Sequence, residues 1–165
     1  MSIDPNRLIE KMAQQLRQEL SDELLAEAVM IGIHTGGVWV AEQLHQQLNL
    51  TNPLGLLDIN FYRDDFSQGG LHPQVRPSTL PVDLENKTII LVDDVLQSGR
   101  TIRAALNEIF DYGRPDRVIL AILVERSGRE LPIQADVIGE VVELQDDEQI
   151  KLTGPEPLEL KVVKK

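Results

Sequence analysis

The sequence predicts an α/β fold with a parallel β-sheet, and two observations carry that prediction. Residues 89–92 are four consecutive aliphatic residues, which is typical of a strand buried on both faces, as in a parallel sheet. A short turn follows, and apolar residues then recur at i, i+3, i+4 and i+7 from Ile102 to Ile109, as in an amphipathic helix that packs on a sheet. The same order of strand, small-residue turn and helix occurs between Ala28 and Leu48.

Composition limits the class of protein. The chain has 165 residues, which suits one domain over residues 1–165, and the absence of cysteine excludes disulfides, a thiolate nucleophile and a cysteine-based zinc site. The amino terminus lacks a signal-peptide pattern, and no apolar run approaches the ~20 residues of a membrane span, so we expect a cytoplasmic protein. A net charge of −11 argues against nonspecific nucleic-acid binding but leaves room for a localised basic face.

The first third of the chain predicts two helices around one strand. Asp4 before Pro5 is a typical helix start, and apolar residues at positions 8, 9, 12, 16 and 20 predict an amphipathic helix from Pro5 to Leu20. Ser21 and Asp22 can cap one further short turn. Residues 28–33 predict the first buried strand, and a second amphipathic helix continues to Leu48.

The middle of the chain predicts an edge strand and then a loop. Asp58 and Asn60 interrupt the apolar pattern of residues 54–62, so we expect that strand near an edge of the sheet. Residues 63–77 hold two glycines, two prolines and no sustained period, and a loop of this length is usually functional or disordered. We expect a mobile flap over about residues 63–80, able to close over a reacting centre. An insertion without that role is the alternative.

The last third predicts three more strands. Residues 117–124 form a buried strand after the break at residues 113–115, and residues 136–139 form a short one. Residues 158–163 alternate between apolar and polar side chains, which predicts an edge strand or half of a hairpin. Residues 140–157 are mixed, with an acidic run at 146–148 that we expect to be solvated.

The turn between the strand at 89–92 and the next helix predicts a phosphate site. The first N–H groups of a helix have no internal partner and lie at the positive end of the helix dipole, where anions bind. Gly99 allows close approach of an anion to the backbone, while Ser98 and Thr101 add hydroxyl donors and Arg100 adds charge.

Asp93 and Asp94 stand before this turn and predict a different contact. Carboxylates repel phosphate, but they accept hydrogen bonds from sugar hydroxyls or lie near a cation that a polyphosphate carries. The segment therefore predicts a phosphorylated sugar as ligand. The alternative is a solvated strand end with a simple strand-to-helix connection. A second turn, with Gly36 and Gly37, also lets a ligand approach backbone N–H groups closely, although such a turn alone is more often a tight connection.

Residues 89–101 combine hydrophobic residues, two acids, a short loop and Gly-x-Thr, and this resembles the phosphoribosyl-pyrophosphate signature of the type I phosphoribosyltransferases. Nearly end to end, the chain resembles the group of these enzymes that joins uracil phosphoribosyltransferase activity to regulation of pyrimidine operons. The blocks that carry this are residues 31–37, 58–65, 92–101 and 129–139. The resemblance implies a doubly wound parallel sheet with a small hood, and conversion of uracil and phosphoribosyl pyrophosphate (PRPP) to UMP and pyrophosphate with Mg²⁺.

The resemblance also implies roles for residues. Asp93 and Asp94 would meet the ribose 2′- and 3′-hydroxyls, and Arg63 the leaving pyrophosphate or its Mg²⁺. Mg²⁺ would be carried by PRPP, because the sequence offers no dedicated carboxylate cage. The remaining assignments are the 5′-phosphate loop Val95, Leu96, Gln97, Ser98, Gly99, Arg100 and Thr101, the pyrophosphate loop His34, Thr35, Gly36 and Gly37, and a uracil pocket near Arg126, Val137 and Ile138.

Two positions depart from the pattern of the relatives. Many carry Lys-Thr-Arg-Gly at residues 34–37, so two positive side chains are missing here and we expect weaker pyrophosphate binding. Other phosphoribosyltransferases place an aspartate at position 97, where it can act as a base. Gln97 cannot, and we expect this to affect rate more than reaction type, because the N1 proton of uracil is acidic.

The resemblance leaves alternatives open. In this group an mRNA leader binds a basic face of a dimer, supplied in part by the first helix, whereas the helix here mixes both signs of charge. The chain could therefore be an enzyme that makes UMP, or mainly a nucleotide-sensing RNA-binding regulator with incidental catalysis. A phosphoribosyltransferase that acts on a purine is a third possibility. We expect at least a homodimer from the resemblance.

Overall fold

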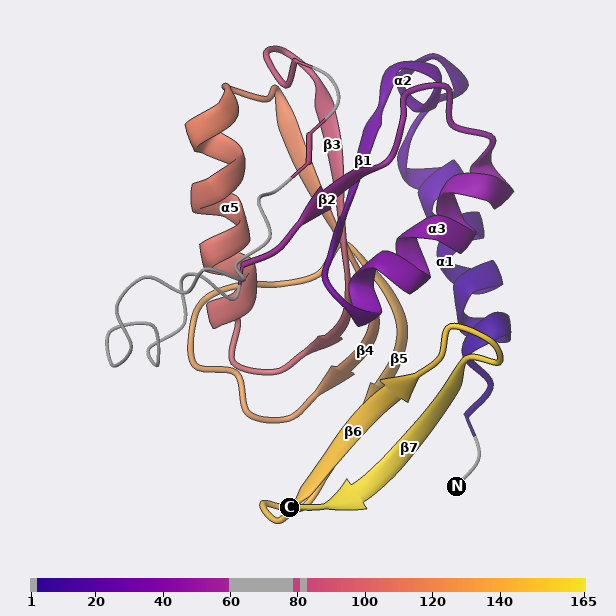
Figure 1. Cartoon of the computed structure of the whole chain (residues 1–165), viewed down its shortest axis with the longest axis vertical. Coiled ribbons are helices and arrows are strands. Elements are labelled where there is room, and N and C mark those ends of the chain that lie inside the picture. The colour runs from indigo at the N-terminus through magenta and orange to yellow at the C-terminus, as the bar shows by residue number, and fades with distance from the viewer. Residues whose placement is uncertain (1–2, 60–78, 81–82) are drawn as a thin grey trace.

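The structure is a computed structural model that describes residues 3–59, 79–80 and 83–165. Its centre is a parallel five-stranded sheet with the order β2-β1-β3-β4-β5 (Figure 1). From β1 the chain forms β2 on one side, and it then crosses to the other side of β1 to form β3, β4 and β5, so the sheet is doubly wound. The predicted fold class is confirmed. The strands are β1 (Val29–Ile33), β2 (Gly55–Leu57), β3 (Thr88–Leu96), β4 (Arg117–Arg126) and β5 (Val137–Val142).

Helices cover both faces of this sheet. Helix α5 (Arg100–Tyr112) lies on one face, and α1 (Pro5–Glu19) and α3 (Gly36–Leu48) lie on the other (Figure 1). Each layer has its own apolar cluster, because alternate residues of a strand point to opposite faces. Ile90 and Val92 of β3 join the cluster under α1 and α3, whereas Ile89 and Leu91 join the cluster under α5.

Local sequence signals explain where the first helices begin. The Asp4 side chain accepts a hydrogen bond of 3.0 Å from the backbone N–H of Asn6, and Pro5 occupies the first turn of α1. Ser21 caps α2 (Asp22–Glu27) in the same way, through a 3.2 Å bond from Leu24 N–H to its hydroxyl. Both helix starts lie where the sequence predicts them.

Helix α1 also protects the free edge of β5. The Gln15 amide donates to the carbonyl of Ile138 at 2.9 Å and accepts from its N–H at 3.2 Å, as a neighbouring strand would. Lys11 Nζ donates to the carbonyl of Gly139 at 3.0 Å. These bonds satisfy backbone groups that an edge strand otherwise leaves open to association.

A second, two-stranded sheet forms the small hood. Strands β6 (Glu148–Thr153) and β7 (Glu159–Lys164) pair antiparallel (Figure 1). The predicted strand at 158–163 matches β7. Strand β6 was not predicted, because the acidic run at 146–148 obscures the alternation of buried Ile150 and Leu152 with more exposed residues. These two side chains and Leu158 join the apolar cluster under α1 and α3, so the hood packs on the main body.

Strand lengths differ from prediction at several places, and β3 runs four residues beyond the predicted run at 89–92. Strand β2 is an edge strand as expected, but it has three residues, and residues 60–62 of the predicted strand lie outside the described part. Strands β4 and β5 run two and three residues beyond the predicted ends at 124 and 139. The predicted flap falls outside the described residues, except for residues 79 and 80. Within the described residues, no helix has the length and apolar character needed to cross a membrane.

The approach of β1 to α3 is close at Gly32. A Cβ atom added there would lie 2.9 Å from Ala41 Cβ and 3.0 Å from Val38 Cα, both on α3. Only glycine fits without a shift of the helix. Because α3 begins four residues after Gly32, this contact fixes the position of the intervening turn.

We predict that Gly32→Val lowers the free energy of unfolding by about 1–3 kcal/mol, since overpacking forces α3 away from β1. Urea denaturation followed by circular dichroism measures this. Lys161→Val is the control, because it places the same side chain at an exposed strand position, where the change should be within about 0.5 kcal/mol. Equal stability of the two variants would contradict the packing argument.

Candidate active site

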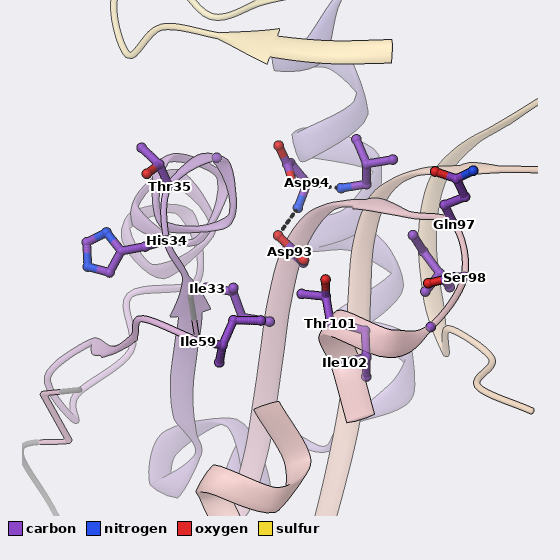
Figure 2. A pocket seen from close by; sticks show the side chains of 14 residues that line it. Ile33, His34, Thr35, Ile59, Asp93, Asp94, Gln97, Ser98, Thr101 and Ile102 are labelled. Atoms are coloured by element: carbon purple, nitrogen blue, oxygen red, sulfur yellow. Dashed lines mark hydrogen bonds between the residues drawn. The ribbon is translucent and has the colours of Figure 1, made fainter. Parts of the chain in front are cut away.

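A cavity of about 360 Å³ opens at the carboxyl ends of β1 and β3 (Figure 2). Strands β1 and β3 are parallel neighbours, and Gly32 pairs with Val92, so the residues that follow them leave the sheet side by side. Polar groups dominate the lining. It comprises Ile33, His34, Thr35, Gly36, Ile59, Asp93, Asp94, Val95, Leu96, Gln97, Ser98, Gly99, Thr101 and Ile102.

Asp93 and Asp94 lie in the middle of this cavity. His34 and Thr35 flank them on one side, and Gln97 and Ser98 on the other (Figure 2). Oδ1 of Asp93 accepts a 2.8 Å bond from the N–H of Asp94, and Oδ1 of Asp94 accepts a 2.9 Å bond from the N–H of Val95. Asp93 is buried and Asp94 half-buried, and Oδ2 of Asp94 has no hydrogen-bond partner among the described residues. That oxygen can accept a bond from a ligand hydroxyl.

The start of α3 packs directly against these two acids. A Cβ atom added at Gly36 would overlap the Asp94 carboxylate, and one at Gly37 would lie 2.9 Å from Oδ1 of Asp93. The two glycines therefore leave the space that the carboxylates occupy. Gly36 lines the cavity, whereas Gly37 packs against Asp93 and does not line it. The peptide bond between His34 and Thr35 is cis.

The start of α5 supplies the anion-binding groups. Gly99 has a φ of 94°, a left-handed conformation that favours glycine, and it turns the chain from β3 into the helix. The Ser98 hydroxyl accepts a 3.1 Å bond from Arg100 N–H, but the N–H groups of Thr101 and Ile102 have no acceptor among the described residues. Those two amides and the Thr101 hydroxyl are available to an anion.

Arg100 does not line the cavity. Its Nε donates to Oε1 of Glu130 at 3.0 Å, and both side chains are largely exposed. The loop that contains Glu130 also contacts the 5′-phosphate loop through its backbone, because the N–H groups of Glu130 and Leu131 both donate to the carbonyl of Ser98 at 3.0 Å. Arg100 thus joins the 5′-phosphate loop to the loop that contains Glu130, and its guanidinium contacts a carboxylate rather than the predicted phosphate site.

A second, smaller cavity of about 170 Å³ shares Leu96 and Gln97 with the first. It lies between the end of β3, the end of β4 and the connection from β5 to the hood. The Gln97 side chain is close to Gly128, where an added Cβ would lie 3.1 Å from its Nε2. The other lining residues are Glu125, Arg126, Ser127, Gly128, Arg129, Val141 and Glu143.

The remaining predicted residues divide into three cases. Arg126 lines the smaller cavity. Val137 is 1% exposed in the apolar cluster, the backbone groups of Ile138 are bonded to Gln15, and neither residue lines the larger or the smaller cavity. Arg63 lies outside the described residues.

Sequence reasoning missed several cavity residues. Ile33, Ile59 and Ile102 line the larger cavity, and Glu143 lines the smaller one. The three isoleucines look like core residues in the sequence.

Comparison with known proteins now decides the family. The model of the phosphoribosyl transferase domain matches residues 2–158. The chain belongs to the phosphoribosyl transferase family. It is therefore a phosphoribosyltransferase, and the cavity at the ends of β1 and β3 is the candidate active site of one.

Relatives specify the group within this family. The chain is 56% identical over 164 residues to the bifunctional protein PyrR of Nitrosococcus oceani, covering 98% of this chain and 93% of the relative. It is 55% identical over 157 residues to the bifunctional protein PyrR of Pseudomonas aeruginosa, covering 95% and 92%. The resemblance drawn from the sequence motifs to this group is confirmed.

Solved structures agree on the fold. The purine phosphoribosyltransferase of Pyrococcus horikoshii superposes with a TM-score of 0.63 at 23% identity, covering 84% of this chain and 86% of that one. A hypoxanthine-guanine phosphoribosyltransferase of Bacillus anthracis gives a TM-score of 0.68 at 18% identity, covering 86% and 83%. At these identities the likeness establishes the fold and not the base that is used.

The positions of Thr101 and Arg100 predict unequal roles in binding PRPP. We expect Thr101→Val to weaken binding about tenfold or more, because it removes a hydroxyl that lines the cavity and can donate to a charged phosphate. Arg100→Ala should cost less than about 1 kcal/mol, as for an exposed ion pair. Titration calorimetry with PRPP and Mg²⁺ compares the two variants. A larger loss in Arg100→Ala would show that the guanidinium leaves Glu130 for the ligand.

Proposed function

We propose that this chain is a uracil phosphoribosyltransferase, which converts uracil and PRPP to UMP and pyrophosphate. The observation that carries the proposal is the larger cavity, in which two acids, an anion-binding helix start and a glycine turn converge. The relatives named PyrR support the choice of uracil, because they form the group in which the sequence motifs place the chain. Asp93, Asp94 and Arg63 are the residues that we assign to the reaction.

The ligand would lie across the cavity with its phosphate over α5. The N–H groups of Thr101 and Ile102 and the hydroxyls of Ser98 and Thr101 would bind the 5′-phosphate. The ribose hydroxyls would then meet Asp94 and Asp93, of which Asp94 is the more exposed. The diphosphate would extend toward the turn at residues 34–37, where backbone groups replace the basic side chains of many relatives.

The reaction replaces the C1–O bond to pyrophosphate with a C1–N1 bond to uracil. Positive charge develops on the sugar ring and negative charge on the departing diphosphate, so the protein contributes positioning and electrostatic stabilisation. The nearby Asp93 and Asp94 fix the ring through its hydroxyls, and their negative charge favours the cationic ring. The chain needs no nucleophile of its own, in accord with the absence of cysteine.

Mg²⁺ would enter with PRPP as part of the substrate. No group of three or more metal-ligating side chains occurs among the described residues. Diphosphate oxygens are the hard ligands that Mg²⁺ prefers, and a half-buried carboxylate such as Asp94 fits beside such an ion. Bound in this way, Mg²⁺ would offset the charge of the leaving group.

The smaller cavity is the place that we assign to uracil. It adjoins the sugar site through Leu96 and Gln97, and the Glu125 carboxylate and the Gln97 amide offer both acceptors and donors for the base. This proposal replaces Val137 and Ile138 with residues that line the cavity. Gln97 would orient uracil by hydrogen bonds, since an amide cannot take the N1 proton.

The domain organisation, oligomeric state and cellular location of this enzyme are also part of the proposal. The hood and the main sheet share one apolar cluster, which supports one domain over residues 1–165. We further propose a homo-oligomer in the cytoplasm, on the strength of the resemblance alone.

UMP formation tests the function, measured with uracil, PRPP and Mg²⁺ for the native chain and for an Asp93→Asn, Asp94→Asn double variant. We expect turnover by the native chain and a loss of at least about a hundredfold in the variant, because each change removes a charge-assisted bond to the sugar. Circular dichroism establishes that the variant is folded. Product from hypoxanthine but not from uracil would replace this proposal with a purine phosphoribosyltransferase.

Regulation through RNA is the second candidate function, and the word bifunctional in the names of the relatives favours it. Helix α1 carries three basic side chains for this role, but hydrogen bonds to backbone carbonyls hold two of them in place. Lys11 is bonded to Gly139, and Arg17 donates to the carbonyl of Gln47 at 2.8 Å, which leaves Arg7 among its basic side chains.

We expect any binding to a pyr leader RNA to weaken steeply with salt, because phosphate contacts release counterions. Filter binding over a salt series, with and without UMP, measures it. Arg7→Ala should reduce both affinity and salt slope, whereas Arg114→Ala at an exposed loop position serves as control. Undetectable binding at low salt would rule out the regulatory role.

A further inference from the structure

Arg126 is a buried cation at the carboxyl end of β4. The residue is 7% exposed, and none of the described carboxylates lies within salt-bridge distance of its guanidinium. Burial of a charge is costly unless hydrogen bonds compensate for it. The bonds that Arg126 makes therefore indicate what the residue does.

Both hydrogen bonds that the guanidinium makes to the described residues go to backbone carbonyls. Nε donates to the carbonyl of Ser127 at 3.0 Å, which folds the side chain back on its own loop. Nη1 donates to the carbonyl of Glu148 at 2.8 Å, and Glu148 is the first residue of β6. Arg126 thus joins the end of a central strand to the start of the hood.

The acceptor at Glu148 is itself held in place. The Glu148 carboxylate accepts a 2.8 Å bond from the N–H of Gln145, and the Glu148 N–H donates to the Gln145 carbonyl at 3.0 Å. The turn that leads into the hood is therefore closed on itself. The bond from Arg126 to Glu148 and the Ser127 hydroxyl, which lies 3.4 Å from both the N–H and the carbonyl of Leu144, together fix this turn relative to the end of β4.

The hood has a second attachment at some distance from this one. Ile150, Leu152 and Leu158 pack into the apolar cluster, and the far turn approaches Trp39 of α3 through Gly154. Apolar packing is not directional. The bond from Arg126 is directional, and it sets the start of the hood relative to the end of β4, where Arg126 itself lines the smaller cavity.

We infer that Arg126 is a positioning residue, which holds the connection from β5 to the hood against the end of β4, where Glu143 of that connection lines the smaller cavity, and so sets the affinity for the nucleobase. This inference rests on the proposed function, in which that cavity takes uracil. A planar guanidinium can donate in two directions at once, which the ammonium group of lysine does with poorer geometry. The 5′-phosphate loop and the acids lie on the other side of Gln97, so their ligand should be bound as before.

Arg126→Met tests the inference, because methionine keeps much of the length and removes every donor. Amide hydrogen exchange should become faster in β6 and β7 and remain unchanged in β1 and β3. The KM for uracil should rise on the order of tenfold, as expected for loss of a hydrogen bond from a charged group, and the KM for PRPP should stay within about twofold. Arg126→Lys should restore part of both effects.

Arg114→Met is the matched control, since it removes an exposed arginine near the amino end of β4. It should leave hood exchange and both KM values at native levels. If Arg126→Met does not fold, the comparison of native chain and Arg126→Lys gives the same two readouts.

Two results would overturn the inference. A raised KM for uracil with unchanged hood exchange would mean that Arg126 touches the base directly, through the Nη2 donors that have no acceptor among the described residues. Equal increases in both KM values would mean a general disturbance of the site. If the native chain makes no UMP, the proposed function fails, and hydrogen exchange alone then decides whether Arg126 holds the hood.

Discussion

The candidate site depends on the close contact between the carboxyl end of β3 and the first turn of α3. Asp93 and Asp94 occupy space that any side chain at Gly37 or Gly36 would fill, and Gly32 brings α3 near enough for this contact. The parallel pairing of β1 with β3 then places the turn after β1 next to the acids. A sugar site and a diphosphate site can adjoin because two neighbouring parallel strands end at the same level.

The loop after β4 connects the other parts of the site. Arg126, directly before this loop, donates to the start of the hood, the glycine of the loop adjoins Gln97, and its later backbone N–H groups donate to the Ser98 carbonyl. The end of β4 and this loop therefore contact the hood, the proposed base cavity and the phosphate loop.

The sequence predicted the parts that short-range patterns determine. The runs of aliphatic residues gave β1, β3 and β4, and the capping residues Asp4 and Ser21 gave the helix starts. The acids and the helix start around Gly99 were predicted together because one strand-turn-helix unit contains them. Residues that depend on pairing between distant segments were harder to predict. Val137 and Ile138 were assigned to a base pocket, but the Gln15 side chain covers that edge of β5, and no local pattern indicates a contact across 123 positions. Arg100 likewise pairs with Glu130 across a loop.

The glycine at position 36 changes how the missing positive charges should be understood. Many relatives place a long basic side chain there, and a simple view is that this chain has lost one contact to pyrophosphate. Here the Asp94 carboxylate lies where the first carbon of such a side chain would be. An arginine at position 36 would therefore displace Asp94, which we propose binds the sugar. In a chain of net charge −11, we propose that the diphosphate is bound by Arg63, by backbone N–H groups and by the cation that the substrate brings. The position of the Asp94 carboxylate and the absence of a side chain at position 36 of the pyrophosphate loop thus depend on each other.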